Sequence, residues 1–327
     1  MPPAGVSPGT VDVGVVRPPL QRGKGGGLNF GQKFKRDWVM LALILPGLLF
    51  FTIFYYIELL GYVIAFENYL PFLGFFKSEF VGLANFSAMI QDASFWQAVQ
   101  NTLIIAMMQV LLFFPAPILL ALLVSSIVST KWRRFIQSIV YLPHFIGWVI
   151  IVSLFQQLLG GTGVFNHFMA ALGVQGVNVM ASPPLFKWLV TFQLIWKDTG
   201  WGTIIYLAAL LSIDASLYEA AAVDGAGRWK RMWNVTLPGI LGITILLLIL
   251  RLGAILSVGF EQILLQRDAV GPKAGEILDT WVYYHGIVGG QWGITAAAGL
   301  IKGIIGAAMV IGANKFAHMF GQEGLYN

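Results

Sequence analysis

Five ionisable residues stand inside stretches of sequence that otherwise carry no charge: Glu58, Lys197, Asp198, Arg251 and Lys302. A charge at the centre of a membrane-spanning helix costs about 2.5–3.5 kcal/mol on insertion scales, so each should face protein or a water-filled cavity. Lys197 and Asp198 are neighbours and point in different directions on a helix, so each needs another partner. Two roles remain open for these residues. They form ion pairs between helices, for example Glu58 with Arg251 or Lys302, or they line a passage for a solute.

No enzyme or metal chemistry is recognisable in the sequence. It contains neither the Gly-x-x-x-x-Gly-Lys-Ser/Thr phosphate loop nor a Gly-x-Ser-x-Gly nucleophile elbow, and it has no cysteine. Its four histidines, at 144, 167, 285 and 318, are widely separated, and we expect them to be packed or interfacial rather than metal ligands. We therefore expect no catalytic residue, no metal site and no cofactor bound by this chain.

The stretch from Ser212 to Ile240 predicts a surface on which another protein could dock. Asp214 or Ser216 could cap a short helix, which the glycines at 225 and 227 would end. A second amphipathic stretch then leads to Pro238, which can occupy the first turn of the next helix. Small alanines beside Glu219 would fit a groove on another protein, and the Glu219 and Asp224 carboxylates could pair with its basic groups. The alternative is an amphipathic connector that rests on lipid headgroups.

The composition indicates that these segments belong to a membrane protein. Of the 327 residues, 57% are hydrophobic and 11% are charged, whereas about 25% are charged in an ordinary soluble domain. The mean hydropathy is +0.76. The net charge is +5, but the basic residues are scattered and form no patch with interleaved aromatics, which argues against nucleic-acid binding.

The uncharged intervals predict an all-α membrane protein with six transmembrane helices. The expected spans are residues 38–66, 99–126, 135–159, 185–213, 237–260 and 291–314. Glycines at 160, 161 and 163 should end the third span, and residues 164–184 should form a connection outside the membrane. Residues 67–93 should form a partly extended external loop that contains a short helix.

The basic residues predict the orientation. Most of the 20 lysines and arginines lie in the N-terminal tail, near residues 131–134 and 228–231, and at Lys315. By the positive-inside bias, both termini are expected in the cytoplasm. Residues 1–37 are expected to form a disordered cytoplasmic tail without a signal peptide. Residues 38–320 should form the membrane domain, with the cytoplasmic loop 212–240, and residues 321–327 a cytoplasmic C-terminus.

The loop 212–240 resembles the EAA motif of ABC-importer permeases. The motif consists of Glu-Ala-Ala, three residues, Gly, nine residues and Ile-x-Leu-Pro, and this chain departs from it only in having valine at position 235. The resemblance implies that the segment is a coupling helix, which docks into a cleft of a separate ATPase subunit. The implied ATPase-coupling residues are Glu219, Ala220, Ala221, Asp224, Gly225, Leu237 and Pro238.

The resemblance extends over nearly the whole chain and points to carbohydrate importers of the lipoprotein/polysaccharide type, similar to maltose and alginate importer permeases. It is carried by residues 80–86, 101–103, 114–117, 141–145, 196–202, 250–253, 259–262, 279–283 and 321–325. It implies a type I ABC-importer permease fold, transport by alternating access, and a bacterial inner-membrane location. The implied partners are a second, non-identical permease subunit, two ATP-binding subunits that hold ATP and Mg, and an extracytoplasmic solute-binding protein.

This resemblance makes an oligosaccharide or polysaccharide the expected substrate. Three basic against two acidic residues in the spans would suit an anionic sugar, such as alginate or a pectic fragment. Aromatic rings could stack on pyranose faces, although tryptophan and tyrosine are also common in interfacial belts and helix packing. The candidate rings are Trp196, Trp201, Tyr206, Tyr141 and Phe145. The substrate-path candidates are Lys197, Asp198, Arg251, Lys302, Glu58, Trp196 and Trp201.

Two alternatives remain at this point. In an ion-coupled secondary transporter, Glu58 and Asp198 would carry protons or sodium, and uptake would collapse with an ionophore. In a noncatalytic scaffold, the loop 212–240 would recruit some other cytoplasmic protein. Only the ABC-permease interpretation requires a stable complex with an ATPase.

Overall fold

The computed structural model describes residues 30–319 and 324 and contains two units, residues 1–60 and 61–327. In the first unit, the described residues form α1 (Phe30–Phe51), the π-helical turn η1 (Thr52–Tyr56) and α2 (Ile57–Leu60). The helix thus begins before the boundary predicted at residue 37, because glutamine, lysine and arginine are good helix formers. The rest of the predicted tail, and residues 320–323 and 325–327 of the predicted C-terminus, lie outside the described residues.

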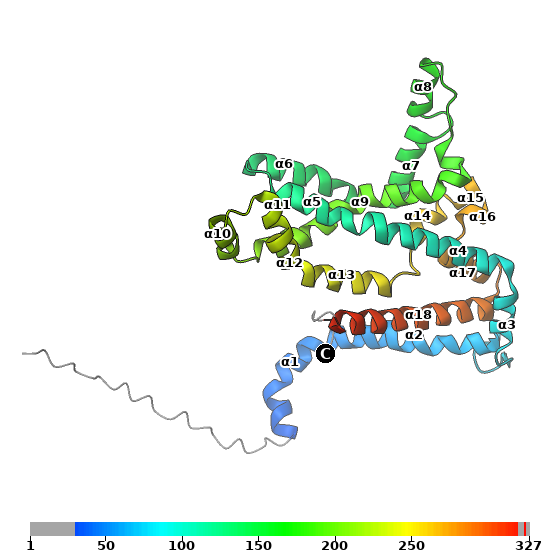
Figure 1. The fold of residues 1–327 in the computed structure, drawn as a ribbon. Helices are drawn as coiled ribbons and strands as arrows, with labels where there is room; N and C mark the ends of the chain where they lie inside the picture. Colours follow the sequence, from blue (N-terminus) through cyan, green and yellow to red (C-terminus); the bar gives the residue numbers. More distant parts are fainter. Residues whose placement is uncertain (1–29, 320–323, 325–327) are drawn as a thin grey trace, which may run out of the picture. The chain divides into compact units, whose positions relative to one another are not determined.

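The described part of the second unit is helical apart from one short hairpin. Its longest helices are α4 (Ala93–Met108), α9 (Pro183–Leu211), α13 (Leu241–Gly253) and α18 (Trp292–Met319). Helix α5 (Pro115–Ser125) packs against α9, and α13 packs along α18 (Figure 1). The hairpin pairs β1 (Glu67–Asn68) with β2 (Glu79–Phe80) and precedes α3 (Ala84–Gln91). The predicted loop 67–93 is therefore partly extended and contains a short helix, as expected.

Four helical segments of the described chain are long and apolar enough to cross a membrane: Asp37–Phe66, Ala93–Ser125, Trp148–Ala171 and Trp292–Met319. Two bent pairs raise the number to six if each pair is one span. These pairs are Pro183–Leu211 with Ala215–Val223, and Arg228–Gly239 with Leu241–Gly253. The all-α fold with up to six spans agrees with the prediction.

The third predicted span, 135–159, is not one continuous helix. Helix α6 (Thr130–Tyr141) runs into the 3-10 turn η4 (Leu142–Phe145), and α7 (Trp148–Leu159) starts afresh after Gly147. Pro143 lies in η4, where its missing N–H and its ring prevent a regular helix from continuing. Helix α7 ends at Leu159, where the glycines were predicted to end it, and α8 (Val164–Ala171) begins after Gly163. Both helices project away from α9 (Figure 1). The predicted connection 164–184 thus contains α8 and the 3-10 turn η5 (Val179–Ala181).

Two spans widen into a π-helical turn just before a proline. The turn η3 (Gln109–Phe113) precedes Pro115, and η6 (Met232–Thr236) precedes Pro238. A proline ring clashes with the carbonyl four residues earlier, and a wider turn relieves this clash. Pro238 lies in the short α12 (Leu237–Gly239), which ends at Ile240. The helix of span five is therefore shorter than the predicted range 237–260.

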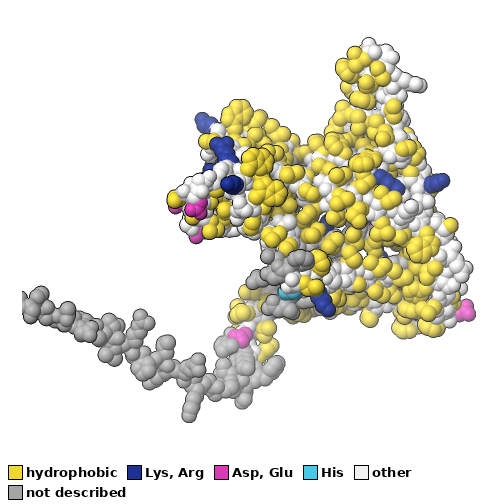
Figure 2. Space-filling model, viewed as in Figure 1, with side chains coloured by type: hydrophobic (Ala, Val, Ile, Leu, Met, Phe, Trp, Pro, Cys, Tyr) yellow, Lys and Arg dark blue, Asp and Glu magenta, His cyan; other side chains and the backbone are white. Residues whose placement is uncertain are grey.

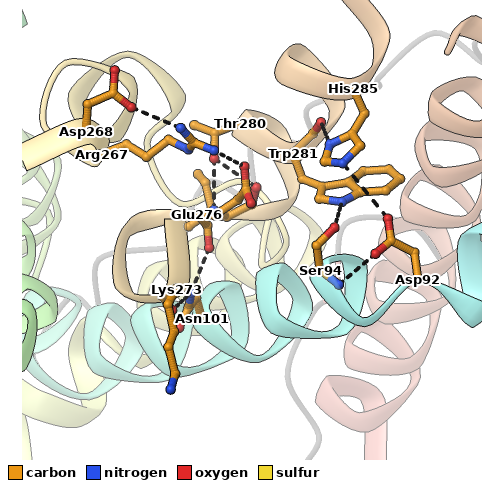
Figure 3. A network of polar contacts seen from close by, with 11 residues as sticks. Asp92, Ser94, Asn101, Arg267, Asp268, Lys273, Glu276, Thr280, Trp281 and His285 are labelled. Atoms are coloured by element: carbon orange, nitrogen blue, oxygen red, sulfur yellow. Dashed lines mark hydrogen bonds and ion pairs between the residues drawn. The ribbon is translucent and has the colours of Figure 1, made fainter. Parts of the chain in front are cut away.

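The remaining short helices connect α13 to α18. They are α14 (Phe260–Leu264), α15 (Arg267–Val270), α16 (Pro272–Gly275), α17 (Leu278–Val282) and the π-helical η7 (Tyr283–Val288). Two of them, α16 and α17, pack against α4. The Asn101 side-chain amide donates to the backbone carbonyls of Lys273 (3.1 Å) and Glu276 (2.9 Å), and Arg267 pairs with the Glu276 carboxylate at 2.7 Å (Figure 3). These contacts fix the position of α17, whose Trp281 is fully buried.

Candidate functional site

The segment 212–240 folds as two short helices with a glycine turn between them, as predicted. Helix α10 (Ala215–Val223) begins after Asp214, whose carboxylate accepts a hydrogen bond from the Ser216 N–H at 2.9 Å. This backbone hydrogen bond stabilises the carboxylate and lowers the pKa of Asp214. Of the two predicted caps, the structure uses Asp214. Helix α11 (Arg228–Arg231) then leads into η6.

The end of α10 requires a glycine at only one of its two glycine positions. Gly225 has a φ of +71°, and its N–H donates to the Ala222 carbonyl while the Ala226 N–H donates to the Ala221 carbonyl at 2.9 Å. This pairing satisfies the last carbonyls of the helix and needs a left-handed residue after the cap, which favours glycine. Gly227 has a φ of −66°, which any residue can adopt.

Helix α10 is tied to the membrane helices by contacts on both sides. The Tyr218 hydroxyl lies 3.0 Å from the Thr236 hydroxyl in η6. Ile213, just before α10, packs with Leu237 against a cluster that contains the buried residues Tyr206 of α9 and Ile240. These contacts connect the α10 segment to η6 and to α9.

The outward surface of α10 and α11 is unusually apolar for an exposed face. Leu217 is 53% exposed, Val223 88% and Trp229 74%. The Glu219 and Asp224 side chains are also exposed, and neither has a hydrogen bond or ion pair within the described residues. Figure 2 shows acidic and basic side chains gathered at this end of the second unit, next to hydrophobic ones. Such a surface is suited to a protein partner.

The ammonium group of Lys197 donates hydrogen bonds to backbone carbonyls rather than pairing with a carboxylate. Its ammonium group donates to the carbonyl oxygens of His144 and Ile146, both at 2.7 Å, and the residue is only 8% exposed. These carbonyls are free because η4 interrupts the helix there. Trp148 lies 5.5 Å from the ammonium group and adds a cation–π contact.

Asp198, the neighbour of Lys197, has a different partner, as the sequence predicted. Its carboxylate lies 2.8 Å from His144 Nδ1, and the His144 ring stacks on Trp201 with the ring centroids 4.5 Å apart. Trp196 lies on another side of α9 and makes an edge contact with Phe155 at 5.8 Å. The two tryptophan candidates are therefore in separate environments.

Arg251 and Lys302 also have partners that the sequence did not identify. The Arg251 guanidinium donates to the side-chain oxygen of Gln109, in the π-helical turn η3. Lys302 of α18 forms an ion pair with Asp279 of α17. Glu58 lies in α2 of the first unit, where its side chain is exposed.

The Lys302–Asp279 pair lines an open cavity of about 630 Å³. Tyr283, Phe260 and Ser257 also line it, so it combines a charge pair, aromatic rings and a hydroxyl. Lys302 is accordingly the predicted path residue with the clearest access to a cavity. In the described part of the chain, no three histidine or carboxylate side chains converge as a metal site would require.

Three partners of the charged residues in the spans were not predicted from the sequence: Gln109, Asp279 and His144. His144 and Asp198 are separated by 54 residues, so no local spacing connects them. Gln109 could have been noticed as a polar residue within the uncharged interval 93–130, followed by a proline at 115. Asp279 precedes the sixth span and pairs with a lysine inside it, which hydropathy cannot reveal.

Comparison with known proteins identifies the family. Residues 113–265 match the family described as binding-protein-dependent transport system inner membrane component. The chain is 42% identical over 310 residues to the protein LplB of Bacillus subtilis (strain 168), covering 94% of this chain and 97% of LplB. The chain belongs to this family. It is a membrane permease of the ABC-transporter type and not an enzyme.

Other relatives and solved structures agree with this assignment. The polygalacturonan/rhamnogalacturonan transport system permease protein YteP of B. subtilis (strain 168) is 42% identical over 288 residues, which cover 88% of this chain and 90% of YteP. A chain of a bacterial alginate ABC transporter, solved in complex with an alginate pentasaccharide-bound periplasmic protein, superposes with a TM-score of 0.84 at 35% identity. The match covers 91% of this chain and 100% of that chain. The type I importer fold inferred from the EAA motif is thus confirmed.

Family membership carries implications for partners and location. An inner-membrane component of a binding-protein-dependent system works with an ATPase and a solute-binding protein. The ATPase is a separate subunit, so ATP is bound outside this chain. The ion-coupled secondary transporter and the noncatalytic scaffold are both inconsistent with this family.

Proposed function

We propose that this chain is one of two non-identical permease subunits that import an acidic oligosaccharide or polysaccharide. The observation that carries the substrate class is the similarity, over most of the chain, to permeases named for two acidic polymers. One is a polygalacturonan/rhamnogalacturonan permease, and the other belongs to an alginate transporter. The proposed complex adds two ATP-binding subunits, which hold ATP and Mg, and an extracytoplasmic solute-binding protein.

The cavity between α17 and α18 supports a saccharide as the solute. Tyr283 and Phe260 provide ring surfaces, and their centroids lie 5.8 Å apart. The Lys302 ammonium group pairs with the Asp279 carboxylate. In this proposal, a uronate carboxylate of the sugar binds the same ammonium group. Lys197 is less suited to this role because backbone carbonyls already surround its ammonium group.

The coupling role is proposed for Glu219, Ala220, Ala221, Asp224, Gly225, Leu237 and Pro238. In this proposal, α10 docks into a cleft of an ATP-binding subunit and moves with it when ATP closes the pair. The contacts of Tyr218 and Ile213 transmit this movement to η6, α9 and α13. Alternating access requires such a rigid connection between two bistable assemblies. Both termini and α10 would lie in the cytoplasm, which the distribution of basic residues supports.

The test is uptake by the assembled importer in proteoliposomes, with its solute-binding protein supplied outside. We expect ATP-dependent uptake of a labelled uronate oligosaccharide that greatly exceeds uptake of a neutral oligosaccharide of equal length. An ionophore should leave this uptake unchanged. Preferential uptake of the neutral sugar would contradict the substrate class, and uptake that survives ATP depletion would contradict the mechanism.

A further inference from the structure

A second cavity, of about 870 Å³, lies beside α10 and is separate from the proposed sugar path. Its walls come from α5, from α6, from the last turns of α9 and from the α10–η6 segment. Three arginines line it, Arg133 from α6 and Arg228 and Arg231 from α11. This cavity is called the arginine cleft below.

No carboxylate among the described residues neutralises the positive charge of the arginine cleft. No carboxylate lines the cleft, and no salt bridge to these arginines is formed among the described residues. One guanidinium nitrogen of Arg133 donates a hydrogen bond to the Ile127 carbonyl at 2.8 Å. The Nε atoms of Arg133 and Arg231 are buried, and neither has a hydrogen-bond partner in the described chain. Unsatisfied buried donors on cations favour an anion at this place, and arginine suits the oxygen geometry of a phosphate.

The other wall of the arginine cleft is apolar. Leu122 of α5 and Leu207 and Leu210 of α9 line the cleft within about one helical turn of the C-terminal ends of these two helices. A free phosphate or nucleotide would gain nothing from these leucines. A molecule with an anionic head and a hydrocarbon chain would contact both walls at once.

We propose that the arginine cleft binds an anionic glycerophospholipid of the leaflet that faces α10. Its phosphate lies among Arg133, Arg228 and Arg231, and an acyl chain lies along Leu122 and Leu207. Basic pockets between transmembrane helices on the cytoplasmic side are suited to such headgroups. The assignment of the leaflet rests on the orientation proposed above, whereas the binding itself does not depend on the substrate. Tyr218 of α10 also lines the cleft, so a bound lipid contacts the coupling helix directly.

The experiment measures phosphatidylglycerol bound to the purified, assembled importer by native mass spectrometry after delipidation and titration. We expect the double variant Arg133→Gln/Arg231→Gln to lower the apparent affinity at least tenfold. The matched control is Arg134→Gln/Lys230→Gln, which removes the same charge from exposed neighbours that do not line the cleft. Equal loss in both double variants would overturn the proposal, because it would indicate general surface attraction.

A second variant keeps all three arginines and tests the apolar wall. Leu207→Trp should fill the space for the acyl chain and also lower phosphatidylglycerol binding, so the proposal stays testable if the arginine variant fails to assemble. Unchanged lipid affinity in Leu207→Trp would overturn it. Inorganic phosphate and glycerol phosphate serve as competitors that lack the chain. If either displaces the lipid at concentrations equal to that of the lipid, the site is one for free phosphate and the proposal fails.

Discussion

At the scale of single residues, the two glycines of the segment 212–240 have different backbone conformations. Gly225 has a φ of +71° and Gly227 a φ of −66°, and a Cβ added at either would meet no atom within 4 Å. Space is therefore not the difference between them. A left-handed conformation costs a non-glycine residue about 1–2 kcal/mol, and only Gly225 needs that conformation.

This difference leads to a prediction for alanine and asparagine variants. Gly225→Ala should reorient α10 and reduce transport coupled to ATP hydrolysis, while Gly227→Ala remains close to wild type. Gly225→Asn should be milder than Gly225→Ala because asparagine tolerates the left-handed region better. Gly225→Asp, which also adds a charge, should insert into the membrane but uncouple transport from hydrolysis. The measurement is the ratio of sugar transported to ATP hydrolysed; wild-type coupling in Gly225→Asp would contradict the role.

The lysines of the spans should separate into one structural and one path residue. Lys197→Met leaves two carbonyls without a donor, and loss of a charged hydrogen bond costs about 1.5–3 kcal/mol. We therefore expect a lower thermal-inactivation temperature of the complex, with an unchanged preference for acidic sugars. Lys302→Gln should instead weaken the preference for acidic over neutral sugars in the uptake assay. The reverse pattern would show that the roles are exchanged.

At the scale of elements, α10 combines an apolar exposed face with carboxylates that have no partner in the described chain. Exposed Leu217 and Val223 alone would also suit lipid headgroups. The tight C-terminal turn and the Tyr218–Thr236 contact instead hold α10 in one orientation. A fixed orientation is needed for a shape-specific docking surface and is unnecessary for a loose connector.

The charge of this surface can be tested at Glu219. Glu219→Lys should leave membrane insertion intact but weaken docking to a basic region of the ATP-binding subunit, and so uncouple transport. Glu219→Gln, which has the same shape without the charge, should have an intermediate effect. Copurification of the ATP-binding subunits and the coupling ratio are the measurements. Wild-type uptake by Glu219→Lys would refute the electrostatic part of the docking proposal.

At the scale of the whole molecule, the orientation in the membrane can be tested directly because the chain has no cysteine. A single cysteine is therefore labelled without background. In intact cells with the outer membrane permeabilised, a membrane-impermeant maleimide should label Lys77→Cys. It should label Ser7→Cys only after the inner membrane is opened. The opposite result would place the coupling segment outside the cell and overturn the proposed mechanism.

The sequence by itself determined the class of the protein and the two-helix form of the segment 212–240, in which it predicts the coupling residues. Both are properties of local sequence. Hydropathy follows from composition within a window, and the EAA spacing specifies a helix, a left-handed turn and a second helix within one loop. The prediction of the third span failed because a single proline at 143 interrupts an interval that hydropathy scores as uniformly apolar.

Only the tertiary structure decided the partners of the charges within the spans. Lys197 could have served the substrate, but η4 exposes carbonyls that hold its ammonium group. Lys302 pairs with Asp279 beside a cavity, and three arginines from two distant segments meet around another. Burying a charge forces it to find a partner wherever the packed helices bring one near, and that proximity depends on how the helices pack rather than on spacing along the chain.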